Sequence, residues 1–161
     1  MTTPGSPIHL VRRFFGSLRA RRPTPGDQVL VASLVTPEEA RLFWAQPVAD
    51  QAHGVAAARR VAALAPDRDD LVRAALLHDV GKRHARLGVI GRSVASLLAI
   101  LRLPRTRRHA AYLSHGDLGA ADLAAAGSDP VTVAFARDHH RARPDDVAPD
   151  DWKVLVAADT E

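Results

Sequence analysis

Apolar residues recur at helical spacing along most of the chain, and no segment alternates apolar and polar positions as a half-buried strand does. The first such segment spans residues 8–18 and carries Leu10, Val11, Phe14, Phe15 and Leu18. This spacing predicts a short amphipathic helix at the N-terminus. Prolines at positions 23 and 25 then predict that residues 22–26 form a linker.

Side chains that can cap a helix precede several later periodic segments. Thr36 stands before Pro37 and two glutamates, and Asp50 is a suitable cap for the segment that carries His53. Asp67 or Asp69 would open the next helix, which ends near residues 78–79. We expect one helix that begins at residue 37, one over residues 50–65 and one that ends near residue 79. Further helices are expected over residues 91–101, 105–113, 118–126, 131–140 and 151–158. The pattern therefore predicts an all-α fold without internal repeats.

Composition narrows the class of protein. A chain of 161 residues fits one domain with a sizeable core. It has no cysteine, so a disulfide or a thiolate-bound metal is excluded, and any metal must be held by nitrogen and oxygen. The longest apolar stretches are far shorter than the roughly 20 residues of a membrane span, and the N-terminus lacks a signal-peptide pattern. We expect a soluble, cytoplasmic protein.

The net charge of +4 is unevenly distributed along the chain. No acidic residue precedes Asp27, whereas five arginines do: Arg12, Arg13, Arg19, Arg21 and Arg22. We therefore divide the chain into a basic amphipathic segment with its linker, residues 1–26, and a domain over 27–161. The basic helix packs on the domain through its apolar face, or it contacts anionic lipid or nucleic acid weakly. Its sequence does not choose between these alternatives.

Five of the eight histidines form a spaced series with two aspartates. The series comprises His53, His78, Asp79, His115, His139, His140 and Asp159. Taken singly, each of these residues could be a surface or hydrogen-bonded core side chain. Together they lie on or at the ends of five predicted helices, and imidazole and carboxylate are the donors that hold iron, manganese, zinc or nickel. We therefore expect a metal site assembled from several helices.

The adjacent pair His78 and Asp79 is the strongest local signal. Neighbouring residues on a helix diverge by about 100°, so both can reach one centre only at a helix end or a loosened turn, and Gly81 would loosen it. A carboxylate at this position can bridge two cations about 3.5 to 4 Å apart. Lys82 would lie near the same edge as a positive group for a phosphate oxygen or an attacking hydroxide.

These motifs resemble those of the HD-domain metal-dependent phosphohydrolase superfamily. The matching residues are His53, the segment AALLHDVGK at 74–82, the segment HGDLGA at 115–120, the pair His139-His140, and Ala158-Asp159. The resemblance covers about residues 51–161. It implies an all-α HD-domain helical bundle with the basic N-terminal helix appended, and a site of the two-metal variety.

The resemblance also implies a role for each site residue. His53, His78 and Asp159 would hold one cation and His115 and His139 the other, with Asp79 bridging them. His140 would bind metal or orient a ligand. Asp79 and Lys82 would be the catalytic residues, with the lysine activating a bridging hydroxide or contacting phosphate. The cofactor would be two divalent transition-metal ions, with iron or manganese preferred and nickel, cobalt or zinc as alternatives.

A small phosphorylated molecule, and among these a nucleotide, is the expected substrate. Residues 141–144 read Arg-Ala-Arg-Pro, not the GYP extension of cyclic-di-GMP phosphodiesterases in the superfamily. Small bacterial members that cleave dinucleoside polyphosphates are closer in length and in the HGxxGA element. Arg92, Arg105 and Arg108 are candidate phosphate contacts. Most basic runs like the one that contains the last two are solvated helix faces, and an arginine such as Arg92 is more often part of a structural salt bridge.

The leading hypothesis is a metal-dependent phosphohydrolase that acts on a phosphate ester or anhydride. One alternative is a non-catalytic HD module that binds a nucleotide or a protein partner and keeps metal for folding. A second is a nucleic-acid-binding protein led by the basic N-terminus, and a third is an HD-fold oxygenase, which would need iron and oxygen.

Overall fold

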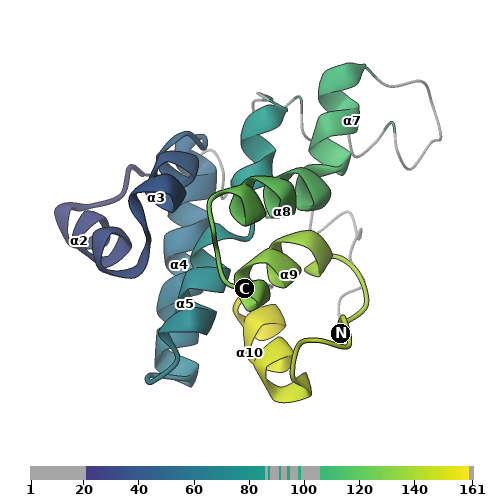
Figure 1. Ribbon diagram of the computed structural model, residues 1–161. Coiled ribbons are helices and arrows are strands. Elements are labelled where there is room, and N and C mark those ends of the chain that lie inside the picture. Colours follow the sequence, from purple (N-terminus) through teal and green to yellow (C-terminus); the bar gives the residue numbers. More distant parts are fainter. Residues whose placement is uncertain are drawn as a thin grey trace.

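The computed structural model describes residues 21–85 and 106–159, together with residues 87, 91, 94 and 98 between them. Every regular element in these ranges is a helix, so the predicted all-α class is confirmed for this part of the chain (Figure 1). No helix among the described residues is long and apolar enough to cross a membrane. The helix expected over 8–18 and most of that expected over 91–101 lie outside the described residues.

The described residues form eight α-helices and one 3-10 helix. They are α2 (Pro25–Leu34), α3 (Pro37–Trp44), α4 (Val48–Leu64), α5 (Asp69–Leu77), the 3-10 helix η1 (Val80–His84), α7 (Arg107–Leu113), α8 (His115–Ala125), α9 (Pro130–Asp138) and α10 (Pro149–Asp159). Thr36 caps α3 as predicted, with its side chain accepting from the backbone of Glu39. Asp50 is not a cap, because α4 already begins at Val48 and holds Asp50 in its first turn.

The linker expected over residues 22–26 is wrong at its C-terminal end, where α2 begins at Pro25. Thr24 Oγ1 accepts from the backbone of Asp27 at 3.2 Å, and the Asp27 carboxylate accepts from the backbone of Thr24 at 2.7 Å. This reciprocal capping box, with proline as the first helical residue, starts a helix. Pro23 and Pro25 predict a linker because proline breaks helices. Pro25, however, occupies the first helical position, where proline is well tolerated.

The core lies around α5, which packs against α4 on one side and α9 on the other. Helix α10 contacts both α4 and α5, and α8 lies against α9 and η1 (Figure 1). The largest fully buried apolar side chains are Phe43, Leu71, Leu76, Leu77, Leu123, Phe135 and Leu155. This arrangement brings the ends of α5, α9 and α10 and the start of α8 toward one region.

Candidate metal centre

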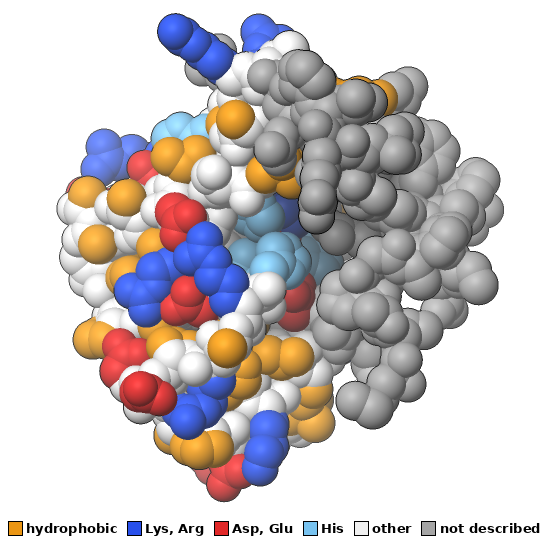
Figure 2. Space-filling view, turned by 90° about the vertical axis from the view of Figure 1, so that its right-hand side faces the viewer, with side chains coloured by type: hydrophobic (Ala, Val, Ile, Leu, Met, Phe, Trp, Pro, Cys, Tyr) orange, Lys and Arg blue, Asp and Glu red, His pale blue; other side chains and the backbone are white. Residues whose placement is uncertain are grey.

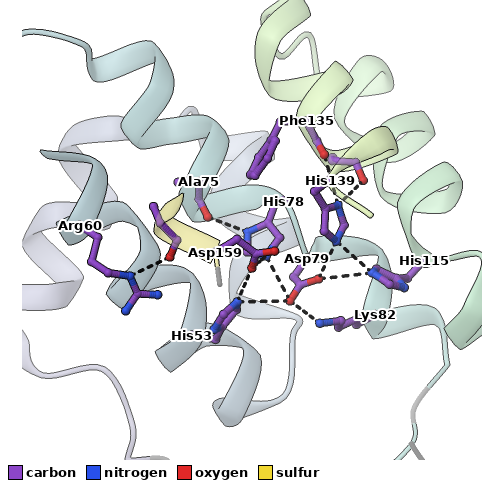
Figure 3. Close-up of polar contacts among 12 residues, drawn as sticks. His53, Arg60, Ala75, His78, Asp79, Lys82, His115, Phe135, His139 and Asp159 are labelled. Atoms are coloured by element: carbon purple, nitrogen blue, oxygen red, sulfur yellow. Dashed lines mark hydrogen bonds and ion pairs between the residues drawn. The ribbon is translucent and has the colours of Figure 1, made fainter. Parts of the chain in front are cut away.

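Six residues of the predicted series come together with Lys82 in Figure 3. The seventh, His140, lies beside His115 and His139. His53 comes from the middle of α4, and Asp159 is the last residue of α10. His78 and Asp79 stand between α5 and η1, His115 begins α8, and His139 and His140 follow α9. Five segments that are far apart in the sequence therefore contribute to a single site.

Three buried histidines are oriented by the same local device. Each donates its Nδ1 hydrogen to the backbone carbonyl three residues earlier: His78 to Ala75 at 2.8 Å, His115 to Tyr112 at 2.7 Å and His139 to Ala136 at 3.0 Å. These carbonyls lie in the last turns of α5, α7 and α9. In a neutral ring this leaves the Nε2 lone pair available for a metal.

The carboxylate of Asp79 lies between two groups of histidines. Its Oδ2 atom is 3.4 Å from His78 Nε2 and 4.0 Å from His53 Nε2. Its Oδ1 atom is 3.4 Å from His115 Nε2 and 3.6 Å from His139 Nε2. One oxygen thus faces each group, which is the placement that a bridging carboxylate requires.

Asp159 completes the first group. Its Oδ1 atom lies 2.9 Å from His53 Nε2 and 3.0 Å from His78 Nε2 (Figure 3). Its side chain is largely buried, and that of His53 is 35% exposed, so this group has an edge that solvent reaches.

His140 belongs to the second group. Its ring centroid lies 4.0 Å from that of His139 and 5.3 Å from that of His115. Donor atoms of these three histidines lie within 4.8 Å of one another, as do those of His53, His78 and Asp79. The described residues therefore contain two His/Asp clusters that could hold metal ions.

Polar atoms without partners indicate that the clusters fit cations. His78 Nε2 and Asp79 Oδ1 are buried and have no hydrogen-bond partner, which is uncommon for buried polar atoms. His115 Nε2 and His139 Nε2 lie 3.3 Å apart. Because both rings donate through Nδ1, two lone pairs would face each other in the neutral rings. Cations would satisfy all four atoms.

The charges of the first group favour a bound cation or proton. Burial lowers the pKa of His78, but the carboxylates of Asp79 and Asp159 outweigh it and raise that pKa to about 10. Burial likewise disfavours ionised Asp79, yet Lys82 and His78 hold its pKa well below the usual range. For Asp159, the charge of His78 and the hydrogen bond from His53 overcome burial and lower the pKa. A metal would replace the proton on His78.

Two histidines of the second group, His139 and His140, have lowered pKa values. Burial, followed by the charge of His78, holds the pKa of His139 well below its usual value. Burial and the neighbouring His115 lower the pKa of His140 to about 4. Neutral imidazole is the form that binds metal, so these side chains need lose no proton before they act as ligands.

Lys82 is buried inside the cluster instead of being solvated. It is 4% exposed, and its Nζ atom donates to Asp79 Oδ2. The 3-10 helix η1 brings the two residues together, because the backbone of Lys82 bonds to the carbonyl of Asp79 at 2.9 Å. The site therefore holds an ammonium group in direct contact with the candidate bridging carboxylate.

Glycines set the spacing of the helices that carry the ligands. A Cβ at Gly54 would lie 2.6 Å from the Leu76 carbonyl oxygen, and one at Gly116 would lie 2.7 Å from that of Arg137. A Cβ at Gly81 would overlap the carbonyl oxygen of His115. Besides the loosening of the turn expected from the sequence, which stays a prediction, Gly81 lets η1 touch α8.

The predicted phosphate-binding arginines are not part of the described cluster. Arg108 is exposed on α7, and no hydrogen bond or ion pair joins it to the described residues of the site. Arg92 and Arg105 lie outside the described residues. Sequence reasoning also overlooked Arg60, whose Nε atom donates to the Ala158 carbonyl at 2.7 Å. Its position seven residues after His53, on the same helical face, was the available signal.

Histidine side chains gather near the middle of the face shown in Figure 2, next to basic and acidic side chains.

Comparison of the chain with protein-family models, curated proteins and solved structures finds no match in any of the three. A function is therefore inferred from the chemistry of the cluster itself.

Proposed function

We propose that this protein is a metal-dependent phosphohydrolase of the HD-domain type, which hydrolyses a phosphate ester or anhydride of a nucleotide. The observation that carries this proposal is the position of Asp79, whose two carboxylate oxygens face separate histidine groups. Two-metal hydrolytic sites need a ligand shared between ions about 3.5 to 4 Å apart. The HD-type motifs at residues 53, 78–82, 115–120, 139–140 and 158–159 support the same assignment.

The donor set suits divalent transition metals. His53, His78 and Asp159 would hold one ion, His115 and His139 the other with His140 beside them, and Asp79 would contribute to both. Nitrogen and oxygen donors favour iron or manganese here, with nickel, cobalt and zinc as alternatives. Divalent ions bound there would lower the pKa of a coordinated water and offset charge on phosphoryl oxygens.

The charge of the site favours an anionic substrate. Asp79 and Asp159 are the carboxylates of the described cluster, and Lys82 already pairs with the first of them. With two divalent cations added, positive charge exceeds negative charge, so a phosphate group is the complementary ligand. Lys82 would then donate to a phosphoryl oxygen. Arg92, Arg105 and Arg108 would contact the remaining phosphates of a nucleotide, and the lack of cysteine fits work in the cytoplasm.

A substrate screen on metal-loaded protein tests this proposal. The purified chain would be loaded with Mn²⁺ or Fe²⁺ and given nucleoside mono-, di- and triphosphates, cyclic nucleotides and dinucleoside polyphosphates. We expect turnover of at least one class, abolished by a chelator and restored by metal. Metal-loaded protein that binds nucleotide without turnover would be a binding module, and oxygen uptake by the iron form would indicate an oxygenase. Either result would contradict the proposed hydrolysis.

A further inference from the structure

The carboxylate of Asp159 lies against two histidines, 2.9 Å from His53 and 3.0 Å from His78. Asp159 is the last described residue of α10. A contact from another helix reaches the last turn of α10: Arg60 Nε donates to the carbonyl of Ala158 at 2.7 Å (Figure 3). The backbone next to Asp159 is therefore tied to α4.

The same face of α4 contacts both the backbone and the side chain at this end of α10. Arg60 follows His53 by seven residues, or about two helical turns, so the two side chains project in nearly the same direction. His53 meets the Asp159 carboxylate at 2.9 Å, while Arg60 holds the preceding carbonyl. The guanidinium also lies at the negative end of the α10 dipole, where a cation is favourable.

We infer that Arg60 is a positioning residue for the metal group of His53, His78 and Asp159. It fixes the end of α10 so that the Asp159 carboxylate faces both imidazoles. This inference rests on the metal centre of the proposed function, although Arg60 is not itself a ligand. Replacing residues that orient metal ligands typically weakens metal binding by about 10- to 100-fold.

The chain offers a matched control in Arg73. Its Nε atom donates to the carbonyl of Leu34, the last residue of α2, also at 2.7 Å. Both arginines are half-buried, and each caps the end of a helix. None of the candidate ligands lies on α2. Arg73 lies on α5, and its guanidinium is also 3.7 Å from the carboxylate of Asp129, which caps α9 at the end opposite His139. Loss of Arg73 should therefore remove a helix cap and a long ion pair while leaving the contact between Arg60 and Ala158 in place.

The test compares Arg60→Met, Arg60→Lys and Arg73→Met in the full chain. Each variant would be titrated with Mn²⁺ by calorimetry at a temperature where circular dichroism shows it folded. We expect two binding events in the wild type. Arg60→Met should weaken one of them by about 10- to 100-fold and leave the other unchanged, and Arg60→Lys should weaken the same event less. Arg73→Met should lower the Tm but keep both affinities.

Two results would overturn the role of Arg60 while leaving the metal centre intact. One is a folded Arg60→Met protein with both Mn²⁺ affinities unchanged. The other is an equal loss of affinity in Arg73→Met, which would show a general effect of destabilisation. If Arg60→Met fails to fold, the same comparison uses Arg60→Lys. A wild-type chain that binds no Mn²⁺ would instead contradict the metal centre, and with it this inference.

Discussion

At the scale of single residues, Lys82 separates an enzyme from a metal-stabilised binding module. Its ammonium group contacts Asp79, so replacement removes a positive charge from the place where phosphate would bind. Lys82→Ala should retain metal and fold but lower turnover of the cognate substrate by roughly 10²-fold or more, the effect of losing one electrostatic donor to a transition state. Steady-state kinetics on metal-loaded protein measure this. Unchanged kcat would mean that Lys82 has no catalytic role.

The proton on His78 predicts how metal binding depends on pH. Its pKa of about 10 in the metal-free protein exceeds the roughly 6.5 of an unfolded histidine. The stabilisation from protonated His78 is complete below about pH 6.5 and is lost as the pH rises through 10. Because a metal must displace this proton, Mn²⁺ affinity should increase from about pH 6.5 to about pH 8. Calorimetric titrations across this interval that show constant affinity would contradict the assignment of His78 as a ligand.

At the scale of helices, the close approach of η1 and α8 predicts a sharp steric requirement. Gly81→Ala would place a methyl group against the backbone carbonyl of His115, which cannot move aside as a flexible side chain could. Overpacking of this kind costs about 1–3 kcal/mol and should also displace His115. Gly26→Ala in α2 is the control, since its nearest neighbour is 3.9 Å away and alanine is favoured in helices. Denaturant unfolding would distinguish them, and equal stability of both variants would be inconsistent with this packing.

The helices were largely predictable because their caps and prolines are local features. Thr36 with Glu39 was recognised, and the similar pair Thr24 and Asp27 was missed because two nearby prolines suggested a linker. The histidines and aspartates that cluster in the structure were singled out from residue type and order. A bridging position for Asp79 was expected from the resemblance. Which carboxylate oxygen faces which histidine group could not be predicted from spacing, because it depends on how five segments pack.

The distinction between a ligand and its support was also hidden in the sequence. The seven-residue spacing puts Arg60 on the helical face of His53, but it does not show that Arg60 contacts the carbonyl of Ala158. Spacing likewise does not show that the carbonyl of Tyr112 orients His115. In the first contact the supporting group is an arginine side chain, and in the second it is a backbone carbonyl. Both kinds of group are common in proteins. Only their three-dimensional placement gives them a role.

At the scale of the whole molecule, the basic N-terminus is expected to be an accessory. Because Thr24 and Asp27 cap α2, a truncation should remove residues 1–22, which carry all five N-terminal arginines but no candidate ligand. Turnover of a small substrate should persist in this variant, while any association with anionic vesicles or nucleic acid should weaken. Activity assays and co-sedimentation measure the two properties. Complete loss of turnover in a folded, metal-loaded truncation would place this segment in the active site.

The metal content of two aspartate variants tests the central claim most directly. Asp79 faces both histidine groups, whereas Asp117 lies near His115 in sequence but pairs with Arg141 on the surface at 2.7 Å. Elemental analysis after metal loading should find two ions per chain in the wild type and in Asp117→Ala. Asp79→Ala should lose most of its metal while remaining folded. Equal metal content in the two variants would contradict a centre bridged by Asp79.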